Sequence, residues 1–159
     1  MENTLIVQAV QAVRADQAER LTADPAAEVA LPADLDVLTA NRSTFLDGAD
    51  GAPPHVHTRA SELLFVLGGT LGVLLDRDVT TLERGDLLVV PPRVPHAFGA
   101  ARGADADVLC VFTPGTGRFD YYRLLDRVRR GGADPAGIGA SRDRFDNHYV
   151  DSRAWAAAR

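Results

Sequence analysis

Short apolar runs separated by turn residues fill the middle of the chain. Gly, Pro and Asp residues interrupt them at intervals of roughly 8–12 residues, which is the spacing found in antiparallel sandwiches and barrels. No segment between the runs is long enough for the crossover helix that a parallel sheet requires. The pattern predicts an all-β domain over residues 35–115, with strands in the runs 37–39, 63–67, 71–75, 79–82, 87–90 and 108–112.

The apolar spacing changes after residue 115 to one residue in every three. This spacing places the apolar side chains on one face of a helix, and Gly131 and Gly132 end the pattern. We therefore predict that residues 116–159 form a short C-terminal helix and a polar tail, in which Trp155 is the one large apolar anchor. The predicted helical face consists of Phe119, Tyr122, Leu125 and Val128.

Residues 1–34 carry a weaker pattern. Residues 5–13 fit either an opening strand or a short helix, and the propensities of residues 15–21 favour a helix. Pro25 and Pro32 would end a helix or strand that precedes them. We treat residues 1–34 as an N-terminal strand or irregular segment that leads into the β domain.

Composition narrows the class of protein. Of the 159 residues, 46% are hydrophobic and 25% are charged, which is typical of one folded globular domain. The net charge of −5 offers no positive surface for nucleic acid or for an anionic membrane. All 17 basic residues are Arg, so Schiff-base chemistry, Lys-dependent phosphate loops and Ser–Lys dyads are excluded.

The expected location follows from what the sequence lacks. The single cysteine, Cys110, cannot form an internal disulfide, so nothing requires an oxidising compartment. No apolar run approaches the ~20 residues of a membrane span. The N-terminus carries an acid where a secretory signal has a basic start. We expect a cytoplasmic protein that spans no membrane.

The residues with the clearest chemistry are three of the four histidines, His55, His57 and His96. Histidines two residues apart on an extended segment share one face of the strand. Glu62 follows after a stretch short enough for a hairpin loop. Three imidazoles and one carboxylate suit a transition metal and leave open positions on an octahedral ion. We predict one divalent ion, which could be Fe, Mn, Ni, Cu or Zn.

Each of these residues also has an ordinary structural interpretation. A His-x-His pair on a strand is often a pair of surface or core histidines, and a Glu that begins a strand is usually solvated. A histidine after Val-Pro is often a capped or buried ring. The metal hypothesis therefore depends on the conjunction of these residues with the turn pattern around them.

That conjunction resembles the two motifs of the cupin superfamily. Residues 55–62 and Gly69 resemble the first, which is His-x-His, three or four residues, Glu, six residues and Gly. Residues 85–96 resemble the second, which is Gly, five residues, Pro, x, Gly, two residues and His. The spacing between them is similar to that of small single-domain (type-2) bacterial cupins. The sequence departs from the motifs at Ala49, Arg93 and Ala100, which fall in turns rather than at ligand positions.

The resemblance implies a fold and a ligand set. The fold would be a double-stranded β-helix, a jelly-roll-like barrel, with the short helix after it. The barrel would hold one metal ion near its wider end through His55, His57, Glu62 and His96, and this sequence fills all four ligand positions.

The functional expectation also follows from resemblance. Residues 113–115 and 119–122 look similar to the corresponding part of quercetin-dioxygenase-like cupins, which implies a metal-dependent dioxygenase acting on an aromatic or enolisable small molecule. Glu62 would be the catalytic base, and Leu64, Val66 and Phe98 would line the substrate site, although they also fit plain barrel core. The alternatives are a metal-assisted isomerase, cyclase or decarboxylase, or a cupin that binds a small ligand without chemistry.

The partner expectation is a homodimer. Small cupins often pair through an outer sheet face and an exchanged N-terminal strand. Residues 5–7 could supply the strand, and Leu63, Phe65 and Leu67 could supply the apolar face. Among the remaining candidates, we expect His148 to be a surface or packing residue, the loop arginines Arg59 and Arg93 to be solvated, and Cys110 to be a buried small hydrophobe.

Overall fold

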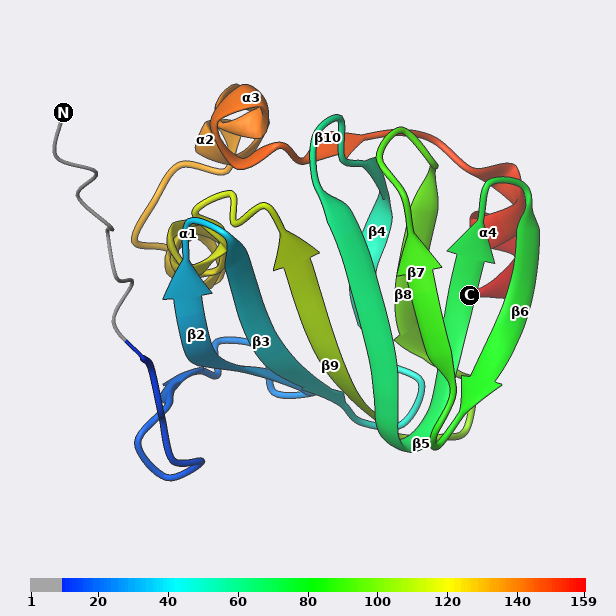
Figure 1. Cartoon of the computed structure of the whole chain (residues 1–159). Coiled ribbons are helices and arrows are strands. Elements are labelled where there is room, and N and C mark those ends of the chain that lie inside the picture. The colour runs from blue at the N-terminus through cyan, green and yellow to red at the C-terminus, as the bar shows by residue number, and fades with distance from the viewer. Residues whose placement is uncertain (1–9) are drawn as a thin grey trace, which may run out of the picture.

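A curled antiparallel sheet of ten strands dominates the computed structural model, which describes residues 10–159 (Figure 1). The strand order is β1-β2-β3-β9-β5-β8-β4-β10, and β6 and β7 also pair with β5. This arrangement confirms the predicted all-β, barrel-like fold with a short C-terminal helix. The strands are β1 (Glu19–Leu21), β2 (Ala27–Leu35), β3 (Leu38–Phe45), β4 (Asp50–Val56), β5 (Ser61–Leu75), β6 (Asp78–Glu83), β7 (Leu87–Val90), β8 (His96–Ala100), β9 (Ala106–Thr113) and β10 (His148–Tyr149).

Strand β5 joins the two halves of the barrel. Its first half pairs with β7 and β9, and its second half pairs with β6 and β8. The sequence pattern predicts two strands separated by a glycine turn, whereas the structure has one strand of 15 residues. The glycines bend this strand instead of ending it: Gly69 has a φ of 68°, and the pairing with β9 shifts register between Val66 and Gly68.

The barrel interior follows the alternation along β5. Glu62, Leu64 and Val66 are buried, whereas Leu63 and Phe65 are partly exposed on the outer face. Period-2 alternation of this kind places one side chain in two toward the interior. The core that results also includes Phe45, Leu71, Val73, Phe98, Ala100, Ala106, Val108, Cys110 and Phe112.

A left-handed residue fixes the loop before β8. Arg93 has a φ of 72°, a conformation in which glycine is the ordinary residue, and it occupies the position where the second cupin motif has glycine. Its backbone N–H donates to the carbonyl oxygen of His57 at 2.7 Å. The loop therefore links the two segments that carry the histidines.

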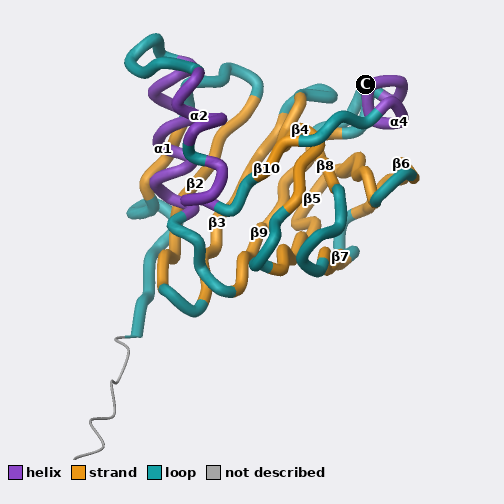
Figure 2. Tube along the Cα trace, turned by 90° about the horizontal axis from the view of Figure 1, so that it is seen from above, coloured by secondary structure: helices purple, strands orange, loops and turns teal. Residues whose placement is uncertain are grey.

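Helix α1 (Arg118–Arg129) agrees with the predicted helix and is followed by Gly131, which has a φ of 73°. It packs beside β1 and β2, at one open end of the curled sheet (Figure 2). The tail then forms α2 (Ala136–Ala140), α3 (Arg142–Phe145), β10 and α4 (Arg153–Ala158). It crosses the sheet from the α1 side to the β6 side, where Trp155 packs against Leu74 and Ala97.

The N-terminal part differs from the sequence prediction. The helix expected over residues 15–21 is wrong, because this stretch forms a turn and then strand β1. Pairing with β2 decides this, since tertiary contacts override a weak helix propensity. Strand β2 lies almost entirely before residue 35 and pairs with β3, with a register shift around Pro32. The strand proposed at residues 5–7 lies outside the described residues.

Candidate metal centre

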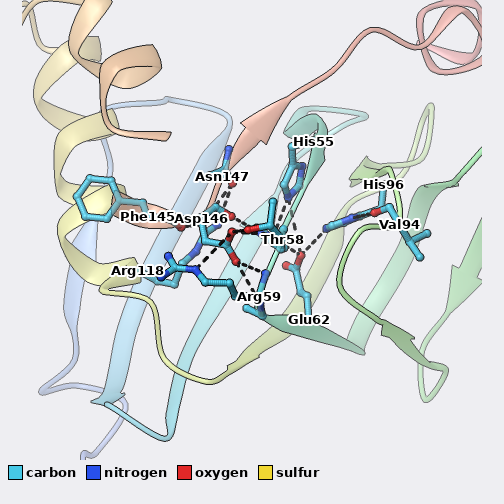
Figure 3. A network of polar contacts seen from close by, with 12 residues as sticks. His55, Thr58, Arg59, Glu62, Val94, His96, Arg118, Phe145, Asp146 and Asn147 are labelled. Atoms are coloured by element: carbon cyan, nitrogen blue, oxygen red, sulfur yellow. Dashed lines mark hydrogen bonds and ion pairs between the residues drawn. The ribbon is translucent and has the colours of Figure 1, made fainter. Parts of the chain in front are cut away.

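The four predicted ligands come from three strands that meet inside the barrel. His55 lies on β4 and His57 follows its end, while Glu62 and His96 lie at the starts of β5 and β8. His55 and His96 are direct neighbours across the β4–β8 pair. All four side chains are buried, and one ligand atom from each lies within 4.8 Å of the others. The structure therefore brings the complete predicted set together; Figure 3 labels three of its members, His55, Glu62 and His96.

The distances between ligand atoms are close to those around one ion: two of the four lie within the expected range and two lie on either side of it. The Oε2 atom of Glu62 lies 2.7 Å from Nε2 of His96, 3.2 Å from Nε2 of His57 and 3.9 Å from Nε2 of His55. The Nε2 atoms of His55 and His57 are 3.2 Å apart. Ligand atoms that bind one ion at about 2.1 Å lie about 3.0–3.4 Å apart in octahedral or tetrahedral geometry.

The opposite nitrogen of each imidazole has a backbone acceptor. The Nδ1 atoms of His55, His57 and His96 lie 2.7, 2.5 and 2.8 Å from the carbonyl oxygens of Pro53, Asp146 and Val94. A carbonyl can only accept, so each Nδ1 carries a proton, and a ring that carries no proton on Nε2 directs the lone pair of that atom toward the centre. Three converging lone pairs and a carboxylate are the donor set of a transition-metal site, and the residues fit such an ion.

Burial and mutual contact shift the pKa values of the cluster. Burial lowers the pKa of His55 well below its ordinary value, and the neighbouring His96 and His57 lower it further. Burial opposes ionisation of Glu62, but hydrogen bonds from His57 and His96 hold its pKa well below the usual range. The same contact with Glu62 raises the pKa of His96 despite burial. The cluster thus keeps Glu62 ionised, and metal binding competes with a proton on His96.

The loop between His57 and Glu62 is held by a single residue of the tail, Asp146. Its Oδ1 atom accepts from the N–H and the hydroxyl of Thr58 at 2.8 and 2.6 Å. Its Oδ2 atom accepts from the N–H groups of Arg59 and Ala60 at 2.9 and 3.0 Å. Since the carbonyl of Asp146 also contacts His57, this residue fixes both the loop and one ligand ring.

A cavity of about 290 Å³ adjoins the cluster, and His55 and Glu62 form part of its wall. Helix α1 and the tail form the opposite wall. A cavity of this size suits a small molecule. The residues that α1 and the tail contribute include Arg118, Tyr121, Tyr122, Leu125, Ile138, Asn147 and Tyr149.

The three predicted substrate-site residues do not share one environment. Phe98 lines the cavity, on the barrel side. Leu64 and Val66 are fully enclosed in the core and are not among the cavity residues. Their inward direction was predictable from the strand period, but whether an inward side chain meets a cavity or another side chain depends on packing.

Sequence reasoning missed the polar wall that α1 and the tail provide. Arg118 lies one turn before Tyr121 and Tyr122 and two turns before Leu125 on the same helix. This i, i+3, i+7 spacing was a usable sign, because it places a charged residue on the apolar face. No sign in the sequence pointed to Asn147, since its position depends on the path of the tail.

The remaining candidates lie outside the ligand cluster. The side chain of His148 is 28% exposed, and its Nε2 is 3.7 Å from Oδ1 of Asp146. Arg59 and Arg93 are exposed, while Cys110 is fully buried in the core. None of these residues supplies a ligand atom to the cluster.

Among residues 10–159, no helix is both long and apolar enough to cross a membrane.

Comparison with known proteins agrees with the geometry. Residues 41–112 match the family model described as Cupin domain. A germin-like protein, subfamily 2 member 3 of Arabidopsis thaliana, is 38% identical over 84 residues. That match covers 45% of this chain and 37% of the plant protein, so the chain spans little more than a third of the relative's length.

Solved structures share the fold. KdgF from Halomonas sp. has a TM-score of 0.60 and 24% identity, over 67% of this chain and 94% of KdgF. An RmlC-like cupin from Shewanella frigidimarina has a TM-score of 0.61 and 23% identity, over 70% and 97%. The polyketide cyclase RemF from Streptomyces resistomycificus has a TM-score of 0.56 and 15% identity, over 76% and 98%. Residues 41–112, which match the cupin domain model, contain all four candidate ligands, and the solved structures share the fold.

Proposed function

We propose that the protein is a metal-dependent enzyme that acts on a small aromatic or enolisable molecule. The observation that carries this proposal is the buried cluster of three histidines and one glutamate beside a cavity of about 290 Å³. A site built only for stability needs no cavity next to its ion, whereas a catalytic site keeps a position open for substrate.

Each group of the site has a separate catalytic role. When bound, the metal supplies a Lewis acid that stabilises negative charge on a substrate oxygen. Glu62, which His57 and His96 keep ionised, accepts the proton of the substrate's hydroxyl or enolisable carbon. Phe98 and the aromatic residues of α1 exclude water and hold the apolar body of the substrate.

The proposed reaction is the dioxygenation expected from the sequence resemblance. The same site also supports a non-oxidative isomerase, cyclase or decarboxylase, and the tyrosine hydroxyls in the cavity favour this second candidate. Tyr121 and Tyr149 are hydrogen-bonded to each other through their hydroxyls, and burial raises the pKa of Tyr121, so it stays protonated. A neutral phenol on the wall of the cavity is a proton donor that oxygen chemistry does not need.

Metal binding is tested first. After loading with Fe(II), Mn(II), Ni(II), Cu(II) or Zn(II) and dialysis, elemental analysis should give one ion per chain for the wild type. His96→Ala should lose it. His148→Ala is the matched control, because it removes the one histidine outside the cluster, and it should retain the ion. Equal metal content in both variants would refute the site.

Oxygen dependence then separates the reactions. Each metal form is supplied with aromatic enols, β-diketones and α-keto acids, with and without oxygen. Oxygen consumption that matches product formation supports a dioxygenase. Full turnover without oxygen, including with Zn(II), supports the non-oxidative reaction. If no metal form turns over a substrate that it binds, the protein is a binding cupin and the enzymatic proposal fails.

We also propose a homodimer formed through the outer sheet face. Leu87 and Val89 of β7 are 57% and 55% exposed and lie beside Phe65 and Leu63 of β5. Leu87→Glu should therefore convert a dimer to a monomer in light scattering. Leu46→Glu is the control, because Leu46 is similarly exposed but lies outside β5 and β7. A monomeric wild type at micromolar concentration would refute the dimer.

A further inference from the structure

Arg118 is a buried charge without an acidic partner. It is the first residue of α1, and only 3% of its surface is exposed. Its Nη atoms donate to the carbonyl of Phe145 at 3.3 Å and to Oδ1 of Asn147 at 3.2 and 3.3 Å (Figure 3). Within residues 10–159 it forms no ion pair with a carboxylate, and its Nε–H has no acceptor.

Aromatic rings hold this guanidinium in place. Its central carbon lies 4.4 Å from the ring centre of Phe112, 4.7 Å from that of Tyr121 and 5.4 Å from that of Tyr122. These contacts partly compensate the charge and orient the plane of the group, but they supply no negative acceptor. A guanidinium stays protonated when buried, so this charge is permanent.

The same residue lines the cavity that adjoins the metal ligands. The other charged residues of the cavity wall, apart from Glu62, have partners of opposite charge. Asp126 pairs with Arg130 at 2.7 Å. Asp24 pairs with Arg129 at 2.6 Å, and Asp50 pairs with Arg159 at 2.8 Å. Arg118 is therefore the one uncompensated cation among the described residues of the wall.

The charges of the loaded site do not balance without an anion. A divalent ion carries two positive charges, Glu62 neutralises one of them, and Arg118 adds another. Because Arg118 and Glu62 are buried, the attraction between these charges and an anion is stronger than at an exposed surface. A buried donor without an acceptor is rare in folded proteins, and a bound ion or ligand is one explanation for it.

We propose that Arg118 binds the carboxylate of a small aromatic or enolisable carboxylic acid. The substrate would lie between the metal centre, which receives its reacting oxygen, and Arg118, which receives its acid group. The Nε–H and one N–H of Nη2 lie on the same edge of a guanidinium, and that edge accepts a carboxylate through two parallel hydrogen bonds. This inference rests on the proposed function, because it names the substrate class of the same cavity.

The test compares acids with their uncharged amides. Calorimetry on zinc-loaded and metal-free protein measures benzoate against benzamide and phenylacetate against phenylacetamide. The wild type should bind at least one acid roughly tenfold more tightly than its amide, as expected for a charge-assisted pair. Arg118→Met should remove this preference, so that acid and amide bind equally. Arg144→Gln is the control, because Arg144 also lies over an aromatic ring but is 70% exposed.

A second measurement needs no variant. The side-chain Nε–H resonance of Arg118 in a nitrogen-15 spectrum of the zinc-loaded wild type should shift with the acid and not with the amide. An unshifted resonance, a wild type without preference for either acid, or a preference that survives Arg118→Met in folded protein would each overturn the inference. An Arg118-dependent preference in protein without turnover would refute the enzymatic proposal and leave the anion site standing.

Discussion

Replacing Asp146 with asparagine should destabilise the protein although it changes one atom. Asparagine keeps one side-chain oxygen and presents an NH₂ group in place of the other. The two N–H groups of Arg59 and Ala60, which donate to Oδ2 at 2.9 and 3.0 Å, then face a donor. Each buried group left without a partner costs about 1–3 kcal/mol, so we expect the two together to cost about 2–6 kcal/mol. The φ of 51° at this position is tolerated by asparagine, so backbone strain does not contribute.

The pKa of Asp146 gives the pH dependence of this loss. Burial raises it, but the hydrogen bonds from Thr58, Arg59 and Ala60 lower it from 3.8 to about 2. A depressed native pKa stabilises the fold at pH values above the unfolded pKa, and that contribution disappears as the pH falls through the native pKa. The difference between wild type and Asp146→Asn should therefore be constant from neutral pH down to about pH 5 and shrink below pH 4.

Urea unfolding of metal-free protein, followed by circular dichroism at several pH values, measures this difference. Asp143→Asn is the control, because Asp143 is 84% exposed on the neighbouring helix, and it should unfold like the wild type. A loss below about 0.5 kcal/mol at pH 7, the usual range for a surface substitution, would refute the loop-anchoring argument. A difference that does not change with pH would show that the carboxylate charge is not its source.

Other predictions concern the bend of β5 and the anchor of the tail. Gly69→Ala should prevent folding, because the new Cβ would lie 1.9 Å from the carbonyl oxygen of Asp105. In the control Gly85→Ala, the new Cβ meets nothing within 4 Å and should cost only about 1–2 kcal/mol of backbone strain. Soluble yield and thermal unfolding compare the two variants, and equal stability would contradict the close approach at Gly69. Trp155→Ala should lower the free energy of unfolding by about 3–5 kcal/mol, because this buried ring packs on Leu74. Its metal content should stay at the wild-type level, and loss of the metal would show that α4 shapes the site.

The strand period predicted much of the site correctly. Inward direction of Glu62, Leu64 and Val66 follows from alternation along one strand, and burial of all three confirms it. The shared face of His55 and His57 has the same origin. These features depend on backbone geometry within a few residues, which the local sequence specifies.

Features that depend on two distant segments were not predictable. The tail residue Asp146 contacts the loop at Thr58 across 88 positions of the chain, and no local pattern encodes such a meeting. The continuity of β5 through Gly69 was missed for a related reason, because a glycine with positive φ can end a strand or bend it. Only the partners on either side, β9 in one half and β8 in the other, decide between these outcomes.

The sequence by itself determined the class of fold, the identity of the four candidate ligands and the helix after the barrel. Each depends on residue type and on spacing along a regular element. The tertiary structure alone decided which surfaces face the cavity, and it placed the unpaired Arg118 there while enclosing Leu64 and Val66 in the core. Packing makes that choice, because filling the interior depends on the shapes of all the elements together.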